Sequence, residues 1–223
     1  MLQSTLKQQG FALIPDVLTS DECLSLGEIL QNSGTPGARC FLDFDWCSNL
    51  AARLKSHPTL STLIPYGHVA VQCTYFEKST TTNWLVPTHQ DLSIPVAEMI
   101  SSASLGGWSQ KEGTTYVQPP VEILQQLIAI RLHIDSCNPQ DGPLQVVPGS
   151  HLLGRIDPQN VSAVRRQLGS IQCPASGGSA LAMRPLLLHA SSKATGSSLR
   201  RVLHFLFGPP SLPYGLRWRV RSN

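Results

Sequence analysis

Apolar and polar positions follow two different patterns along the chain, and the change falls near residue 65. In the first part apolar side chains recur at helical spacing, as at Cys23, Leu26 and Ile29. Thr19 and Glu22 have the spacing of a capping box, and residues 33–37 are rich in Gly, Ser and Pro, which end helices. We therefore predict a helix after Thr19, a second over residues 47–55 capped by Ser48, and a short one from Pro58 towards residue 64.

From Gly67 onward the chain consists of short runs rich in Val, Ile and Leu, separated by Gly, Pro and Asn. This texture is typical of a β-sandwich or barrel. One helix interrupts it, for which Asp157 is the expected cap, Pro158 the first helical residue and Leu168 the approximate end. Residues 92–120 are expected to form a long connection without regular structure, and such connections often serve as lids or binding loops.

One predicted strand, over residues 127–135, separates apolar from ionisable positions. Ile128, Ile130, Leu132 and Ile134 fall on one face, and Arg131, His133 and Asp135 on the other. A strand that is apolar on one side and ionisable on the other suggests a barrel whose interior holds a polar ligand.

Composition narrows the class of protein without choosing among enzymes. A chain of 223 residues, 41% of them hydrophobic, is long enough for one domain with a sizeable core. The net charge of +3 comes with only 14% charged residues and no long basic run, so nucleic acid is not an expected partner. We expect residues 1–223 to form a single domain.

The six cysteines are scattered without a C-x-x-C pair, which favours free thiols in a reducing compartment. The first residues lack the apolar core of a signal peptide, and no apolar run approaches the length that spans a bilayer. A cytoplasmic protein that does not enter membranes is the expectation.

Candidate chemistry begins at His89-Gln90-Asp91. On an extended strand His89 and Asp91 point to the same side, and His189 from another strand would complete a 2-His-1-carboxylate triad, the pattern of non-haem Fe(II) oxygenases. Arg200 follows eleven residues after His189 and offers a planar fork of donors for a carboxylate, while Ser191 would share the histidine's face.

With these residues in place, the sequence resembles the phytanoyl-CoA dioxygenase family of Fe(II)/2-oxoglutarate oxygenases. The resemblance covers most of the chain, from the opening strand at residues 10–15 through His89-Gln90-Asp91 and Gly142-Pro143-Leu144 to His189 and Arg200. It implies a double-stranded β-helix (jelly-roll, cupin-like) core over residues 66–223, with the mainly helical residues 1–65 packed on it.

The resemblance also implies roles for single residues. His89, Asp91 and His189 would bind Fe(II), and Arg200 and Ser191 would bind the carboxylate of 2-oxoglutarate. Two further residues match a family pattern of co-substrate contacts, Gln72 and Lys78. The carboxylate at position 91 favours hydroxylation, because related halogenases have Gly or Ala there. The partners would be a small-molecule substrate and O2.

The chain departs from the family on the strand before the Gly-Pro turn, where several relatives carry an aromatic or small residue and this chain has Arg131 and His133. His133-Ile134-Asp135 is a second His-x-Asp and a rival metal motif. Its surroundings do not match the family's metal strand, so we place Arg131 near the co-substrate and His133 near the substrate, with Trp108 at the entrance beside Trp84 and Tyr116.

The prediction is thus an Fe(II)/2-oxoglutarate-dependent dioxygenase that hydroxylates an unactivated C–H bond of a small polar molecule and releases succinate and CO2. The alternative is a catalytically silent metal-binding jelly-roll protein that serves as a binding module.

Overall fold

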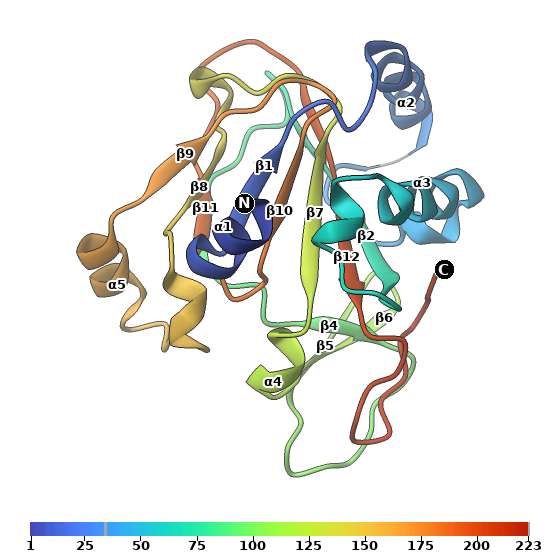
Figure 1. Ribbon diagram of the computed structural model, residues 1–223, viewed down its shortest axis with the longest axis vertical. Helices are drawn as coiled ribbons and strands as arrows, with labels where there is room; N and C mark the ends of the chain where they lie inside the picture. The colour runs from blue at the N-terminus through green and yellow to red at the C-terminus, as the bar shows by residue number, and fades with distance from the viewer. Residues whose placement is uncertain (34, 223) are drawn as a thin grey trace.

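Antiparallel sheets form the core of the fold, which is shown as a ribbon in Figure 1. The computed structural model describes residues 1–33 and 35–222. The largest sheet has the strand order β1-β10-β7-β12-β2, with the bounds Phe11–Ile14, Ala180–Met183, Ile128–His133, Arg200–Gly208 and Val69–Lys78. The second has the order β3-β11-β8-β9, with the bounds Val86–His89, His189–Ser191, Leu144–Val146 and Ile171–Cys173. The predicted jelly-roll class, mostly β with flanking helices, is confirmed.

Two hydrophobic clusters lie on opposite faces of the largest sheet. Ile128, Ile130 and Leu132 of β7 point into the cluster that also receives the N-terminal helices. Ala129 of the same strand points into the other cluster, which joins this sheet to the second sheet and to β4 and β6. The predicted alternation of β7 is therefore present, and its inner face looks towards the second sheet.

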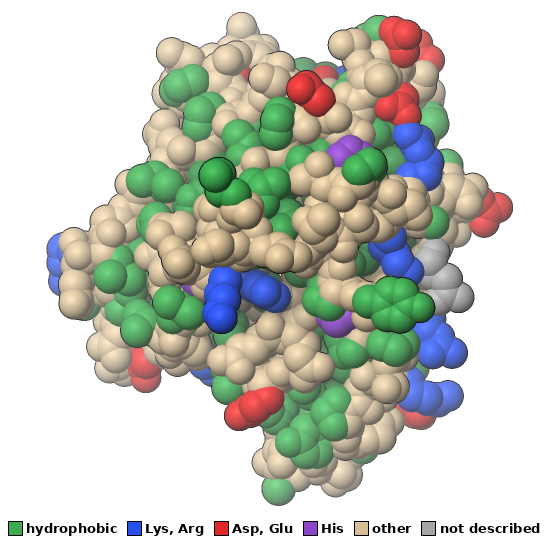
Figure 2. Space-filling view, in the orientation of Figure 1, with side chains coloured by type: hydrophobic (Ala, Val, Ile, Leu, Met, Phe, Trp, Pro, Cys, Tyr) green, Lys and Arg blue, Asp and Glu red, His purple; other side chains and the backbone are tan. Residues whose placement is uncertain are grey.

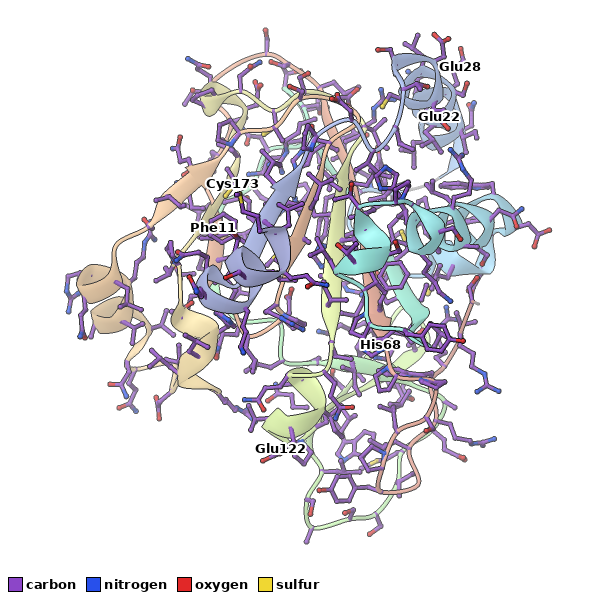
Figure 3. The ribbon with its side chains drawn as sticks, viewed as in Figure 1. Phe11, Glu22, Glu28, His68, Glu122 and Cys173 are labelled. Atoms are coloured by element: carbon purple, nitrogen blue, oxygen red, sulfur yellow. The ribbon has the colours of Figure 1, made fainter. Side chains whose placement is uncertain are left out.

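Helices α1 (Leu2–Gln9), α2 (Ser20–Ser33) and α3 (Asp45–Ser56) belong to the N-terminal part of the chain. The predicted capping box starts α2, because the Thr19 amide donates to Glu22 Oε2 at 2.8 Å and the Glu22 amide donates to Thr19 Oγ1 at 3.3 Å. Glu22 also accepts a hydrogen bond from Arg53 of α3, and Figure 3 shows it on the side of α2 that faces α3. Residue 34, in the predicted stop, lies outside the described residues.

Several predicted boundaries were wrong. The helix predicted for residues 47–55 begins at Asp45, so Ser48 lies inside it and donates to the Leu42 carbonyl instead of capping. The segment after Pro58 forms only a 3₁₀ turn, Leu60–Thr62. Helix α5 spans Val161–Leu168, and Asp157 accepts from the Gln159 amide in a turn that precedes it. A local side-chain bond therefore holds residues 157–159 outside the helix.

The expectation of an irregular connection over residues 92–120 was also wrong. The segment folds into a third sheet of β4 (Ile94–Val96), β6 (Thr114–Gln118) and β5 (Gly106–Lys111), which lies at the lower end of the molecule in Figure 1 and is followed by α4 (Val121–Leu124). Ile94, Val96 and Val117 of this sheet are buried in the inner cluster. The segment is thus part of the core packing.

Charged side chains of both signs are spread over the face shown in Figure 2, with Lys and Arg more frequent along its right-hand margin. All six cysteines are free. Within the described residues, the structure contains no helix with the length and apolar character that a membrane span requires.

Candidate metal centre

The two histidines of the predicted triad face each other across a strand pair. His89 is the last residue of β3, and its partner in the β3–β11 pairing is His189, so their rings lie 4.3 Å apart between centroids. Asp91 follows β3 and places Oδ1 3.6 Å from His89 Nε2 and Oδ2 3.7 Å from His189 Nε2. One ligand atom from each of the three residues lies within 4.8 Å of the others, and no second group of this kind occurs among the described residues.

The hydrogen bonds of both rings leave the Nε2 atoms for a metal. His89 Nδ1 lies 2.8 Å from the Pro87 carbonyl, and His189 Nδ1 lies 2.9 Å from the Leu187 carbonyl. A carbonyl can only accept, so each Nδ1 carries a proton, and Nε2 is the atom that each ring turns towards the site and offers to a metal when it is unprotonated. This is the arrangement in which proteins orient metal-binding histidines. The donor set therefore fits a divalent iron ion.

Gln90, between the two ligands on the chain, fixes their position and was not singled out from the sequence. Its side chain is buried and points away from the triad. It donates to the carbonyls of Leu186 and Gly154 at 2.6 and 2.8 Å and accepts from the Ile156 amide at 2.9 Å. Strand alternation gives the direction of Gln90, but only the folded chain supplies its partners.

A second group of polar side chains, two of them cationic, lies next to the triad and could hold an anion; we call it the anion seat. Lys78 and Arg200 are partners in the β2–β12 pairing, and both are buried. Lys78 Nζ donates to Ser191 Oγ at 2.8 Å and to the Ser192 carbonyl, and Arg200 Nη1 donates to the Gly142 carbonyl at 2.6 Å. All of these partners are neutral, so the two cations keep their charge available for a ligand carboxylate.

Gly142 is required at this seat by both its conformation and its surroundings. Its φ is +63°, in the left-handed region, and a Cβ there would meet the Ser192 carbonyl oxygen at 2.4 Å and Lys78 Nζ at 3.2 Å. The Gly-Pro turn thus brings the backbone close enough to Arg200 and Lys78 to orient them.

Charges at the site shift the pKa values of its groups in opposite directions. Burial raises the pKa of Asp91, but His189, His89 and His204 outweigh it and hold the pKa well below its usual range, so the carboxylate is ionised. Burial, with Arg200 and Arg131 nearby, lowers the pKa of Lys78 to about 8. The cationic end of the site lacks the counter-charge that a bound carboxylate would provide.

The triad and the anion seat open into one cavity of about 430 Å³. Gln72, Lys78, Arg131, Ser191 and Arg200 of the predicted co-substrate residues all line it. Trp84 and Tyr116 line it as well, together with His204, whose Nε2 lies 3.9 Å from Asp91 Oδ2. The sequence did not single out His204, so its contact with the metal centre was missed.

Two predicted substrate residues do not reach this cavity. Trp108 on β5 packs against the inner hydrophobic cluster. His133 is buried on the inner face of β7, behind the lining residues.

The rival motif is also split, because β7 ends at His133 and Asp135 turns to the other side of the sheet. There both oxygens of Asp135 accept from Arg201, at 2.8 Å each, and Arg201 Nη1 donates to the Gly27 carbonyl of α2. The prediction that Asp135 shares the interior face was therefore wrong.

A family model for phytanoyl-CoA dioxygenase (PhyH) matches residues 6–202. The chain belongs to this family, whose members use Fe(II) and 2-oxoglutarate. No curated protein matches the sequence.

Solved structures share the fold over nearly the whole chain at low sequence identity. The nogalamycin-biosynthesis epimerase SnoN has a TM-score of 0.67 and 14% identity, covering 94% of this chain and 82% of its own. HygX from Streptomyces hygroscopicus, crystallised with nickel and 2-oxoglutarate, has a TM-score of 0.64 and 15% identity over 93% and 85% of the two chains. AviO1 from Streptomyces viridochromogenes Tue57 reaches 0.64 and 17% over 95% of each chain.

Proposed function

We propose that this protein is an Fe(II)/2-oxoglutarate-dependent dioxygenase that hydroxylates a C–H bond of a small polar molecule, with residues 1–223 acting as one domain. The observation that carries the proposal is the pair of carbonyl-oriented histidines and one ionised carboxylate converging beside a buried anion seat. One structural neighbour is described as an epimerase and another as a carbocyclase, so hydroxylation itself belongs to the proposal.

The chain supplies binding, orientation and exclusion of water. His89, Asp91 and His189 would hold Fe(II) on one face, which leaves the opposite face for ligands. Arg200, Lys78 and Ser191 would bind the distal carboxylate of 2-oxoglutarate, with Gln72 and Arg131 close by. When bound, the iron and 2-oxoglutarate supply the activation of O2 that oxidises the substrate, with release of succinate and CO2.

Burial of the site strengthens each of these interactions. His189, Lys78 and Arg200 have at most 7% of their surface exposed, so their charges and dipoles act in a medium of low dielectric constant. Hydrogen bonds that the ring nitrogens and Gln90 donate, and the one that the Gly142 carbonyl accepts from Arg200, fix the side chains before any ligand arrives. Such preorganisation avoids the cost of reorienting them during the reaction.

The alternative, a catalytically silent binding module, would use the same fold without turnover. Loss of activity in such a module needs only one defect in the ligand set or the anion seat. Here the triad, Ser191, Lys78 and Arg200 are all present and mutually oriented, which favours the enzyme.

Anaerobic titration with Fe(II) and 2-oxoglutarate tests the proposal. We expect a visible metal-to-ligand charge-transfer band in the wild-type protein, and succinate formation once O2 is admitted. His89→Ala should abolish the band and Asp91→Ala should at least weaken it, because each removes a ligand. His133→Ala should retain the band, because His133 does not line the cavity.

Absence of the charge-transfer band from the wild-type protein would contradict the proposal that the protein is an enzyme. A band that forms normally, with no succinate above the protein-free background for any substrate supplied, would support the silent module. A band that survives Asp91→Ala but is lost in His133→Ala would return the metal to the rival strand.

A further inference from the structure

Positive charge dominates the wall of the cavity. Its lining contains five Lys and Arg side chains and one carboxylate, Asp91; the cations are Arg39, Lys78, Lys111, Arg131 and Arg200. Two of them, Lys78 and Arg200, are accounted for by the distal carboxylate of 2-oxoglutarate. Of the other three, Arg131 lies near the co-substrate site without a carboxylate of its own, and Arg39 and Lys111 have no role in the proposed function.

Arg131 is the most unusual of these three. Only 6% of its surface is exposed, yet no carboxylate pairs with it and its Nε has no hydrogen-bond partner within residues 1–33 and 35–222. The ring of Phe76 lies under the guanidinium, with 5.1 Å between Cζ and the ring centroid. One face of the group is therefore covered, and its in-plane donors remain for a ligand.

A buried, unpaired guanidinium is costly unless an anion neutralises it. Fe(II), Asp91 and dianionic 2-oxoglutarate together carry a net charge of −1, so the three buried cations leave the loaded site with two positive charges. 2-Oxoglutarate alone does not neutralise the cavity.

The backbone of Arg131 lies level with the metal centre along the sheet, and its guanidinium extends over Phe76, whose partner on β12 is Val202, between His204 and Arg200. Arg131 is the partner of His204 in the β7–β12 pairing, and His204 Nε2 lies 3.9 Å from Asp91 Oδ2. Arg200 lies four residues from His204 on β12, about 13 Å along an extended strand. The hydrogen-bonded pair Gln72 and Thr74 lies in the same part of the wall, since Thr74 is the partner of His204 on β2.

We propose that the substrate carries a carboxylate or another small anionic group and that Arg131 binds this group. The inference rests on the proposed function and names the substrate class for the same site. Arg39 is paired with Glu112 at 2.7 Å, whereas Lys111 lies over the ring of Tyr116 at 5.3 Å and attracts an entering anion. A cationic substrate would be repelled by the same wall.

The experiment compares matched acids and amides on the Mn(II)-substituted protein saturated with 2-oxoglutarate. Calorimetric titrations use benzoate against benzamide and phenylacetate against phenylacetamide, which differ in charge but hardly in shape. We expect the acids to bind at least tenfold more tightly than the amides. Arg131→Gln should remove this preference while the Kd of 2-oxoglutarate changes less than threefold, and Arg131→Lys should keep part of it.

Controls separate binding from folding. Arg131→Gln is expected to raise the Tm of the ligand-free protein, because it removes an unpaired buried charge. Arg166→Gln, an exposed arginine on α5, is the matched variant and should behave as wild type.

Equal binding of acids and amides, or no binding of either, would overturn the inference. So would an Arg131→Gln variant that retains the acid preference but binds 2-oxoglutarate tenfold more weakly, since Arg131 would then serve the co-substrate. Failure of wild-type protein to bind Mn(II) and 2-oxoglutarate in the first titration is a separate result, which counts against the proposed function.

Discussion

Lys78 is a buried ammonium group whose hydrogen-bond acceptors, Ser191 Oγ and the Ser192 carbonyl, are neutral. Burial removes water from the charge, and Arg200 and Arg131 repel it, so the pKa of Lys78 falls to about 8. The side chain is still mostly protonated at neutral pH. A carboxylate bound beside it would favour the charged form and raise this pKa.

The affinity for 2-oxoglutarate should therefore fall as the pH rises above about 8. Below that pH the free protein already holds the proton that the bound carboxylate needs. Above that pH the proton must be taken up on binding. The Kd of 2-oxoglutarate therefore rises by up to tenfold per pH unit, until the pH reaches the pKa of Lys78 in the complex with 2-oxoglutarate. Calorimetry on Mn(II)-loaded protein between pH 7 and 9.5 measures this dependence.

Lys78→Arg is the control, because a guanidinium keeps its charge over this range. We expect a much flatter profile for this variant. A wild-type Kd that does not change with pH, or an equal fall in both proteins, would show that Lys78 does not titrate with the co-substrate.

At the scale of strands and helices, local patterns predicted directions better than boundaries. Alternation placed Arg131 and His133 opposite the apolar face of β7, and a capping box placed the start of α2 after Thr19, because both depend on neighbours in the sequence. The sheet of β4, β5 and β6 was missed, since its strands are short and gain their stability from buried contacts with other strands.

For the metal centre, too, the sequence indicated the residues better than their arrangement in space. The residue types and spacing indicated His89, Asp91, His189 and Arg200, but the opposition of His89 and His189 is a matter of strand register. That register depends on packing of the whole sheet. The turn of Asp135 out of the interior could not be read from alternation either, because β7 ends at His133.

The Asp135–Arg201 pair joins the start of β12 to α2 and should be structural. Asp135→Asn leaves the Arg201 guanidinium largely buried without its counter-charge, and we expect a loss of about 2 kcal/mol or more in the free energy of unfolding. Urea denaturation measures the loss. Affinity for Mn(II), measured by competition with a chelator, should be unchanged.

Asp91→Asn should give the converse result, with metal binding severely weakened. Asp157→Asn, in the exposed turn before α5, is the matched substitution that should alter neither property. Weakened Mn(II) binding in Asp135→Asn at a temperature where that variant is folded would argue against a purely structural role.

For the whole molecule, the proposed ligands join two sheets that meet at the cavity. His89 and His189 belong to the second sheet, while Lys78, Arg131 and Arg200 belong to the largest one. Like charges on the largest sheet repel one another, and the triad places a carboxylate and two imidazole lone pairs around one point. A bound metal ion would neutralise the carboxylate and accept the two lone pairs, and a bound dianion would offset the repulsion between the cations of the largest sheet.

Mn(II) and 2-oxoglutarate should therefore stabilise the fold together more than the sum of their separate effects. Each ligand at about 100 times its Kd adds about 2.7 kcal/mol, and for a chain of 223 residues each kcal/mol raises the Tm by about 2–4 °C. We expect a rise of about 5–10 °C with 2-oxoglutarate added to the Mn(II) protein, and a much smaller one with 2-oxoglutarate alone, because its chelating end then lacks the metal. EDTA should reverse the rise. Scanning calorimetry of the wild-type protein and of Asp91→Ala tests this prediction. An equal rise in the Tm of the variant would mean that 2-oxoglutarate binds without the triad. The two sheets would then not be joined through the metal.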